Sequence, residues 1–126
     1  MPSFVILYVK DPRASAAFYE KLLGTPPAEQ SPTFVMFALS PGVLLGLWIR
    51  DEVTPRVSAA PGASELAVTV GSNADVQAAC ARWRAEGAQI SLEPTTLDFG
   101  YCFAMRDPDG HLVRVFCPPR EEKRLP

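Results

Sequence analysis

The sequence predicts an α+β fold built from two tandem βαβββ modules. Each half of the chain contains a strand-like stretch, one helical stripe and then further strand-like stretches. The helix-starting residues Asp11 and Ser72 are separated by almost the same number of positions as the helix-ending glycines Gly24 and Gly87. This constant offset indicates a duplicated unit. Each small sheet can cover one face with its own helix and needs a second sheet against the other face, so the pair should enclose a cleft.

The first module is expected over residues 1–50. Residues 3–9 favour a strand with apolar side chains on both faces. Asp11 followed by Pro12 favours a helix start, because the carboxylate can cap free amides and the proline needs no N–H at the first helical position. The predicted helix covers residues 12–23.

Three strands should complete this module. Residues 25–32 contain too many prolines for more than a short edge strand. Residues 33–39 and 43–50 predict a hairpin about a tight turn at 40–42. Both faces of the strand 33–39 carry large apolar side chains, so the pattern leaves open which face is inside.

The middle of the chain predicts a linker and a second module. Residues 51–63 carry charges, prolines and small residues without periodicity, which is typical of a linker. The second module is expected over 64–118, with a polar tail at 119–126. Within it, a strand at 64–70 precedes a helix that Ser72 caps, and a short strand is expected near 88–92.

A second hairpin should run from residue 99 to residue 116. Its turn is predicted at 107–110, where Asp-Pro-Asp-Gly combines a fixed φ, two carboxylates that can bond backbone amides and a glycine for a positive φ. Alternation places Tyr101, Phe103 and Met105 on one face of its first strand. Arg114 interrupts an otherwise apolar second strand and requires an explanation.

Composition indicates an ordinary soluble globular protein. Of the 126 residues, 48% are hydrophobic and 21% are charged, and the formal net charge is -2. The chain has no basic stripe, so we expect no nucleic-acid partner. Its apolar runs are too short to span a bilayer and its N-terminus has no signal-peptide pattern, so we expect no membrane partner and a cytoplasmic location. The three cysteines lack CxxC spacing and are expected to be reduced.

The chain resembles the vicinal-oxygen-chelate superfamily, which contains glyoxalase I, extradiol dioxygenases and bleomycin-resistance proteins. The resemblance rests on Leu7 to Asp11 (LYVKD), Ala17 to Gly24 (AFYEKLLG) and the Asp-Pro-Asp-Gly turn followed by a strand. It implies the glyoxalase/bleomycin-resistance fold for nearly the whole chain. It also implies a homodimer with sites between the chains.

The resemblance carries four metal-ligand positions onto this sequence. They are Phe4, Gly46, Glu65 and Arg114. Phenylalanine and glycine side chains cannot ligate a metal and a protonated guanidinium repels one, so only Glu65 remains as a donor. We therefore expect no metal, no cofactor, no catalytic residues and no enzyme activity.

The same carry-over implies an aromatic cleft with one ion pair. A finer resemblance is to small metal-free proteins that bind phenazine-type antibiotics. It implies a protein that sequesters or escorts a planar aromatic antibiotic or metabolite and so confers drug resistance. The expected ligand-binding residues are Trp48, Tyr8, Phe4, Gly46, Glu65, Tyr101, Phe103, Arg114 and Phe116.

Several alternatives stay open at this stage. Trp48 can be a stacking platform or a plain core residue, and Arg114 can meet a ligand or simply pair with Glu65. The direction of the Tyr101 and Phe103 face is undetermined. The alternative function is a superfamily enzyme, a lyase, isomerase or dioxygenase, that acts on a small molecule with an atypical or absent metal site. Trp83 lies on the second helical stripe and should be structural.

Overall fold

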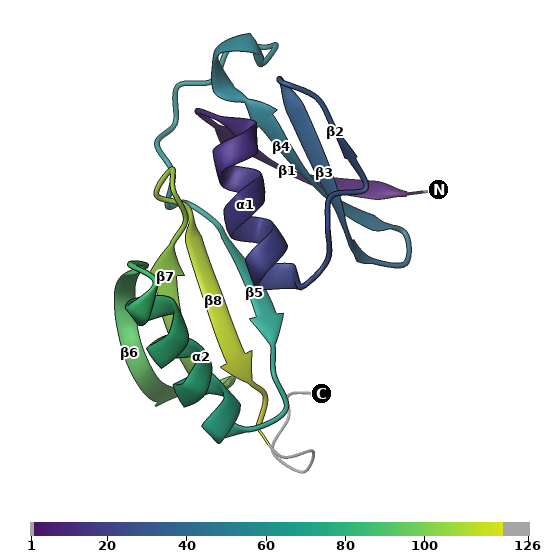
Figure 1. Ribbon diagram of the computed structural model, residues 1–126. Coiled ribbons are helices and arrows are strands. Elements are labelled where there is room, and N and C mark those ends of the chain that lie inside the picture. Colours follow the sequence, from purple (N-terminus) through teal and green to yellow (C-terminus); the bar gives the residue numbers. More distant parts are fainter. Residues whose placement is uncertain (1, 120–126) are drawn as a thin grey trace. The chain divides into compact units, whose positions relative to one another are not determined.

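The computed structural model describes residues 2–119. The chain divides into two compact units, one ending at Ala59 and the other beginning at Ala60. The boundary falls inside the segment 51–63 that the sequence indicates as a linker. Each unit contains one helix and one four-stranded sheet (Figure 1).

The first unit consists of β1 (Ser3–Val9), α1 (Pro12–Leu23), β2 (Glu29–Gln30), β3 (Phe34–Ser40) and β4 (Val43–Ile49), followed by a 3-10 turn at Arg50–Glu52. Its strand order is β1-β4-β3-β2, with β1 parallel to β4 and β3 antiparallel to β4. The second unit consists of β5 (Glu65–Thr69), α2 (Asn73–Ala85), β6 (Gln89–Leu97), β7 (Gly100–Arg106) and β8 (Leu112–Cys117). Its order, β5-β8-β7-β6, repeats that of the first unit. The predicted duplication is therefore confirmed.

The predicted helix caps are present. The Asp11 carboxylate accepts hydrogen bonds from the amides of Arg13 and Ala14 at 3.1 and 3.5 Å, and Pro12 opens α1. Gly24 ends this helix at a φ of 73°, which a residue without Cβ adopts easily. In the second unit the Ser72 hydroxyl accepts from the amide of Asp75 at 3.1 Å.

One strand is longer than expected. The sequence indicates a short strand near 88–92, whereas β6 continues through Pro94 to Leu97. Proline is tolerated here because β6 is the edge strand of its sheet, and the pairing with β7 is irregular between Leu92 and Thr95.

The hairpin turn forms as predicted. The buried Asp107 carboxylate accepts hydrogen bonds from the amides of Asp109 and His111 at 2.9 and 2.8 Å. The amide of Gly110 donates to the carbonyl of Asp107 at 3.0 Å, and Gly110 has a φ of 95°. The turn fixes the register in which Ala104 lies opposite Arg114.

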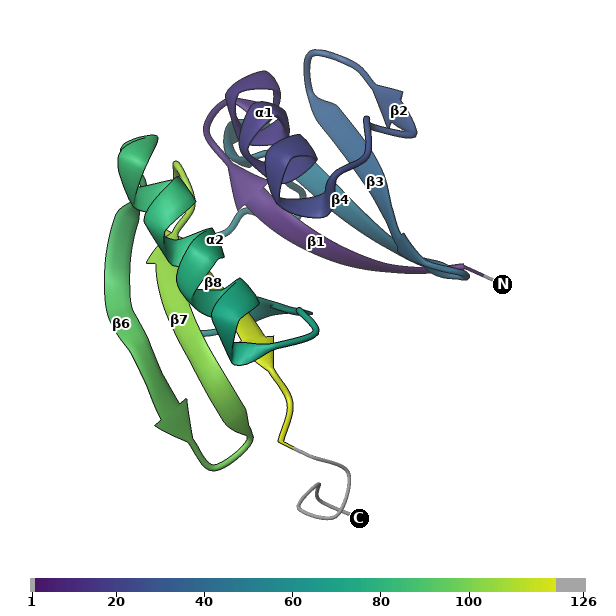
Figure 2. The same cartoon turned by 60° about the horizontal axis from the view of Figure 1, so that its bottom comes forward.

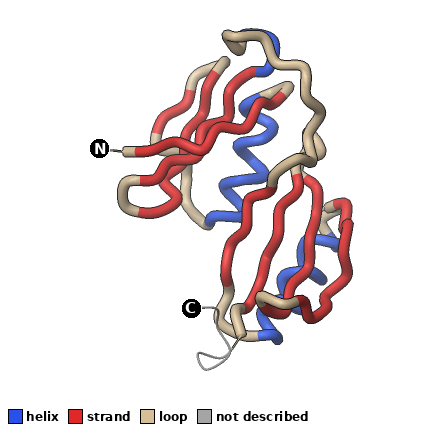
Figure 3. Tube along the Cα trace, turned by 180° about the vertical axis from the view of Figure 1, so that it is seen from behind, coloured by secondary structure: helices blue, strands red, loops and turns tan. Residues whose placement is uncertain are grey.

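Each helix covers one face of its own sheet, as the first two views show (Figures 1 and 2). Under α1 the fully buried side chains are Val9, Val35, Phe37, Leu45 and Leu47. Under α2 they are Phe103, Met105 and Val113, with Val115 almost fully buried. Within residues 2–119, the opposite face of each sheet carries no helix of its own unit (Figure 3). Among residues 2–119, no helix is long and apolar enough to cross a membrane.

Candidate functional site

The helix-free face of the first sheet is apolar and aromatic. Directly paired residues share a face, so the register places three rows of side chains together on this surface, which we call the first outer face. It comprises Phe4, Ile6 and Tyr8 of β1, Leu44, Gly46 and Trp48 of β4, and Phe34, Met36 and Ala38 of β3. Phe4 is 46% exposed and Ile6 39% exposed, while Tyr8 and Trp48 are half-buried. Apolar side chains are thus available to a ligand.

Tyr8 and Trp48 form an aromatic pair at one end of this face. The rings of Tyr8 and Trp48 lie with centroids 6.3 Å apart at an interplanar angle of 67°. The two residues are cross-strand partners at the ends of β1 and β4, and Phe34 is the partner of Trp48 on the other side. Three aromatic side chains from three adjacent strands therefore lie in one row across the sheet.

Gly46 provides the space that Phe34 occupies. A Cβ atom at Gly46 would lie 2.6 Å from Cζ and 3.0 Å from Cε1 of the Phe34 ring. It would also lie 3.4 Å from Cγ1 of Ile6. Ordinary carbon contacts lie near 3.5–4.0 Å, so no larger residue fits at position 46 unless the ring moves.

The helix-free face of the second sheet carries an ion pair. This second outer face comprises Glu65, Ala67 and Thr69 of β5, Leu112, Arg114 and Phe116 of β8, and Cys102, Ala104 and Arg106 of β7. Nε of Arg114 donates to Oε2 of Glu65 at 2.7 Å, and Nη2 donates to Oε1 at 3.0 Å. These hydrogen bonds lower the pKa of Glu65 below its ordinary value, against the desolvation that raises it. They likewise raise the pKa of Arg114.

Arg114 also lies against an aromatic group that the sequence did not indicate. Its guanidinium carbon is 5.6 Å from the centroid of the Phe99 ring. Phe99 in turn packs edge-on against Phe116, with centroids 5.5 Å apart at 84°. Phe99 follows β6 in the tight connection to β7 and is 37% exposed.

Two predicted ligand-binding residues lie on the other side of the second sheet. Tyr101 and Phe103 share a face with Met105 and Val115, which α2 covers. Phe103 is fully buried, and the Tyr101 hydroxyl accepts a hydrogen bond from Nε2 of Gln77 in α2 at 3.0 Å. The direction of this face, which the sequence left open, is toward α2 and away from Arg114, so Tyr101 and Phe103 do not share the surface of the other predicted residues.

The other predicted residues divide between the two faces. Phe4, Tyr8, Gly46 and Trp48 lie together on the first outer face, and Glu65, Arg114 and Phe116 lie together on the second. Sequence reasoning missed Phe34 and Phe99. Phe34 was detectable as a strand residue of unknown face, whereas Phe99 lies in a connection, where no periodicity assigns a direction.

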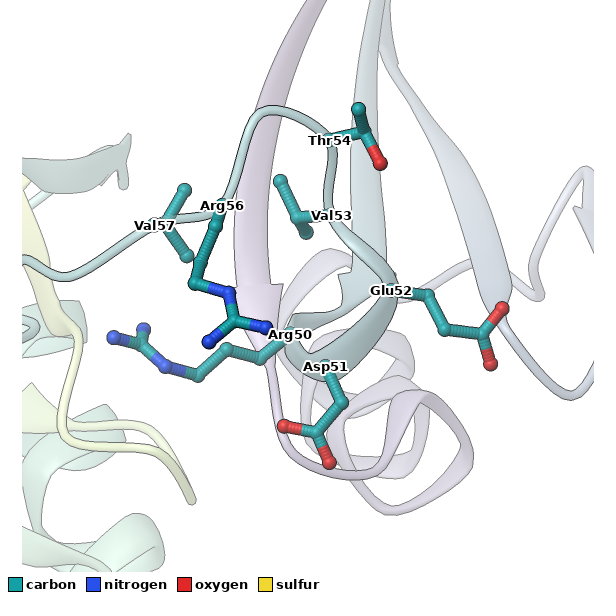
Figure 4. Close-up of a pocket in the computed structure, with 7 residues that line it drawn as sticks. All are labelled: Arg50, Asp51, Glu52, Val53, Thr54, Arg56 and Val57. Carbon is teal, nitrogen blue, oxygen red and sulfur yellow. The ribbon is translucent and has the colours of Figure 1, made fainter.

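A separate cavity of about 580 Å³ lies in the segment after β4. Its lining comprises Arg50, Asp51, Glu52, Val53, Thr54, Arg56 and Val57 (Figure 4). In this view Arg50 and Arg56 extend to the same side of the loop and Glu52 extends the other way. Nη2 of Arg50 donates to the carbonyl of Ala59 at 3.0 Å, so this side chain holds the loop together. The lining contains no aromatic residue, and we place the candidate site on the outer faces.

The metal positions of the resembled superfamily do not fit a metal in this chain. Phe4 has no donor atom, the space over Gly46 is filled by the Phe34 ring, and Arg114 is paired with Glu65. In the part of the chain that the structure describes, no three His, Cys, Asp or Glu side chains come close enough together to hold a metal ion. Glu65 alone offers carboxylate oxygens at these positions.

Comparisons with known proteins agree with this architecture. The sequence model of the Glyoxalase/Bleomycin resistance protein/Dioxygenase superfamily matches residues 2–115. The phenazine antibiotic resistance protein EhpR of Enterobacter agglomerans is 30% identical over 120 residues, which cover 93% of this chain and 91% of the relative.

Two solved structures are also similar. Protein ATC0852 from Agrobacterium tumefaciens has a TM-score of 0.82 at 45% identity, with 94% of this chain and 97% of that chain covered. A glyoxalase-related enzyme from Fulvimarina pelagi has a TM-score of 0.81 at 26% identity, with 94% and 88% covered.

Proposed function

The chain belongs to the Glyoxalase/Bleomycin resistance protein/Dioxygenase superfamily, and on that premise we propose that it is a binding protein for a planar aromatic compound of the phenazine type. It holds the compound against the aromatic row of the first outer face and releases it chemically unchanged. Sequestration of this kind lowers the free concentration of a toxic compound and so confers resistance.

The observation that carries the proposal is the row formed by Tyr8, Trp48 and Phe34 on a sheet face that α1 leaves uncovered. Aromatic side chains stack on flat π-systems, and each such pair adds about 0.5–1.5 kcal/mol beyond the burial of area. Trp48 and Tyr8 are half-buried, so their orientation is fixed by neighbours while part of each ring is accessible. Such a row offers shape and stacking without a group that would attack the ligand.

The order of magnitude of the affinity is sufficient for sequestration. A tricyclic ring that buries roughly 300 Å² of apolar surface gains about 7 kcal/mol at about 25 cal/mol per Å². Stacking adds to this gain, and the loss of translational and rotational freedom offsets part of it. The balance corresponds to a binding free energy of about -8 kcal/mol, which is a dissociation constant in the micromolar range.

The residues at the superfamily's metal positions support binding without metal-dependent chemistry. A catalytic divalent ion polarises a substrate oxygen or activates water, and it needs several oxygen or nitrogen donors. Here Phe4 and Gly46 contribute to an apolar surface, and the positive charge of Arg114 opposes a cation. The relative EhpR, whose name describes phenazine resistance, supports the ligand class. No feature of the outer faces favours an enzyme over this function.

The test is binding followed by recovery of the ligand. Protein treated with a chelator is brought to equilibrium with phenazine across a dialysis membrane, and the compound is then extracted and analysed by mass spectrometry. We expect saturable micromolar binding without added metal and recovery of phenazine with unchanged mass. A product of altered mass, or binding that requires a divalent ion, would contradict the proposal and favour the enzymatic alternative.

The homodimer implied by the family resemblance stays a prediction. Val5, on the helix side of β1, is 47% exposed beside Phe4 and Ile6, so the start of this edge strand presents apolar groups on both faces. Burial of such groups against a second copy is favourable. Light scattering after gel filtration should give twice the mass of the 13.7 kDa chain, and a monomer at micromolar concentration would rule the dimer out.

A further inference from the structure

The cavity in the segment after β4 is lined by two arginines. All of its lining residues lie between Arg50 and Val57, inside the unit that ends at Ala59, and its volume is about 580 Å³. Arg50 and Arg56 extend to the same side of this loop (Figure 4). Among residues 2–119, neither guanidinium forms an ion pair, and the side chain of Arg56 forms no hydrogen bond. Both positive charges can therefore meet a ligand.

The loop that carries these arginines is anchored to its own unit. Val53 is only 7% exposed and Val57 is half-buried, so both side chains hold the loop against the protein. Nη2 of Arg50 donates to the carbonyl of Ala59 at 3.0 Å. That carbonyl is neutral, so the hydrogen bond orients the guanidinium but leaves its charge uncompensated. A site that is already oriented loses less entropy when a ligand binds.

The acidic residues of the lining do not cancel the two charges. Glu52 extends away from the arginines in Figure 4. Asp51 also lines the cavity, but within residues 2–119 it forms no ion pair with either arginine. Two positive charges therefore act together with at most one carboxylate on their side of the loop, and the balance attracts an anion.

We propose that this cavity binds a phosphate group, carried by a small molecule or free, with Arg50 and Arg56 as the donors. A guanidinium presents its N–H groups in a planar fork that matches the oxygens of phosphate. A phosphate monoester carries a charge of about -1.5 to -2 at neutral pH, which suits two arginines better than the single charge of a carboxylate. A phosphate group fills only part of the cavity, so there is room for the rest of a small molecule.

This site is separate from the proposed aromatic site. Its lining shares no residue with the row of Tyr8, Trp48 and Phe34, and its ligand needs no aromatic ring. The two sites can therefore be tested independently, and failure of one leaves the other standing.

The test is a nuclear magnetic resonance titration of the full chain labelled with nitrogen-15. Ribose 5-phosphate, ribose and inorganic phosphate are added separately at pH 7 and constant ionic strength, and the amide signals of residues 50–57 are followed. Ribose is the uncharged counterpart of ribose 5-phosphate. The same titrations are made with Arg56→Gln and Arg82→Gln. Arg82 is an exposed residue of α2 outside the cavity lining, so its substitution removes the same charge elsewhere.

We expect ribose 5-phosphate to shift these signals saturably, with a dissociation constant of about 1 mM or below, and ribose to leave them unchanged. Arg56→Gln should weaken binding about fivefold, and Arg82→Gln should change it by less than about twofold. The exposed Arg56 side chain forms no contact that the fold depends on, so its variant should keep the wild-type urea midpoint. Tighter binding of ribose 5-phosphate than of inorganic phosphate would identify a phosphorylated molecule as the ligand, and the reverse order would identify the free ion.

Three results would overturn the inference. One is the absence of any shift at residues 50–57 with either phosphate compound. Another is equal binding by the wild type and Arg56→Gln, and the third is the same loss in Arg82→Gln as in Arg56→Gln, which would indicate attraction by net charge alone. Dialysis of Arg56→Gln against phenazine separates this inference from the proposed function, because the affinity for phenazine should equal that of the wild type.

Discussion

The close approach of Phe34 to Gly46 makes Gly46→Ala an informative substitution. The added Cβ would lie 2.6 Å from Cζ of the Phe34 ring, about 1 Å inside a normal carbon contact. The backbone of Gly46 is not the obstacle, because its φ is not among the positive values found at six other glycines. The ring must therefore move outward, away from the sheet and from its position beside Trp48.

The change in unfolding free energy on Gly46→Ala is the sum of two opposing contributions, a steric cost and an entropy gain. Overpacking of a well-packed site costs typically 1–3 kcal/mol, and here the lower end, about 1 kcal/mol, applies because Phe34 is half-buried and its ring tip can move. When Phe34 is shortened to alanine, that cost disappears. What remains is the smaller conformational entropy of the unfolded chain, which stabilises a Gly→Ala variant by about 0.4–1 kcal/mol. The entropy gain acts in both backgrounds and cancels from the comparison, so the coupling energy between the two positions should equal the overpacking cost, about 1 kcal/mol.

A double-mutant cycle measures this coupling. The wild type, Gly46→Ala, Phe34→Ala and the double variant are unfolded in urea and followed by circular dichroism. With an m-value of about 2 kcal/mol per M, 1 kcal/mol moves the midpoint by about 0.5 M. Gly46→Ala should lower the midpoint in the wild type and raise it in the Phe34→Ala background. An equal destabilisation in both backgrounds would refute the steric reasoning.

Three further outcomes are expected. Phe103→Ala should lower the free energy of unfolding by about 3–5 kcal/mol in a urea titration, since the side chain is fully buried under α2. The hydrogen bond from Arg114 lowers the pKa of Glu65, so the stability from this pair is fully present above the ordinary pKa of 4.5 and is lost as the pH falls through the lower folded-state pKa. The urea midpoint of Glu65→Gln should therefore decline less between pH 5 and pH 2 than that of the wild type. Ser72→Ala should cost about 1 kcal/mol by thermal unfolding, because the amide of Asp75 loses its cap.

Much of the fold could be predicted because its local signals are independent of one another. Asp11, Pro12 and Gly24 each favour one end of α1 for a separate physical reason, and the structure places all three as expected. The repetition of the pattern then implied two units with the same order of strands. The helix-end residues and the repeated pattern were therefore sufficient to predict the architecture of the two units.

Tyr101 and Phe103, whose face the sequence left undetermined, show where such reasoning ends. Alternation groups Tyr101 with Phe103, but a shift of one residue in the hairpin register moves a whole strand to the other face. The turn opposes Ala104 to Arg114, which turns Tyr101 and Phe103 toward α2. The sequence predicts the turn at 107–110, but it does not say which residues of β7 and β8 lie opposite each other or which face α2 covers.

The site was predictable where side chains lie on strands with a known face. The resemblance to the superfamily implied the faces of Trp48 and Tyr8, because its metal positions Gly46 and Phe4 share a face with them by alternation along β4 and β1. The position of Phe34 was not predictable, because its strand has two apolar faces. The position of Phe99 was not predictable either, because this residue lies in the connection between β6 and β7. The pairing of Arg114 with Glu65 was one of two open alternatives, and the hydrogen bonds at 2.7 and 3.0 Å answer it.

The central claim is that Trp48 binds a planar aromatic ligand. The most direct measurement is equilibrium dialysis of phenazine against the wild type, Trp48→Ala and Trp83→Phe, because the absorbance of the ligand reports affinity independently of either tryptophan. Trp83 is 7% exposed among the buried residues of α2 and serves as the matched control. Loss of the stacking surface should weaken binding about tenfold or more in Trp48→Ala, which corresponds to about 1.4 kcal/mol, and leave Trp83→Phe close to the wild type. Equal affinity of the wild type and Trp48→Ala would contradict the account.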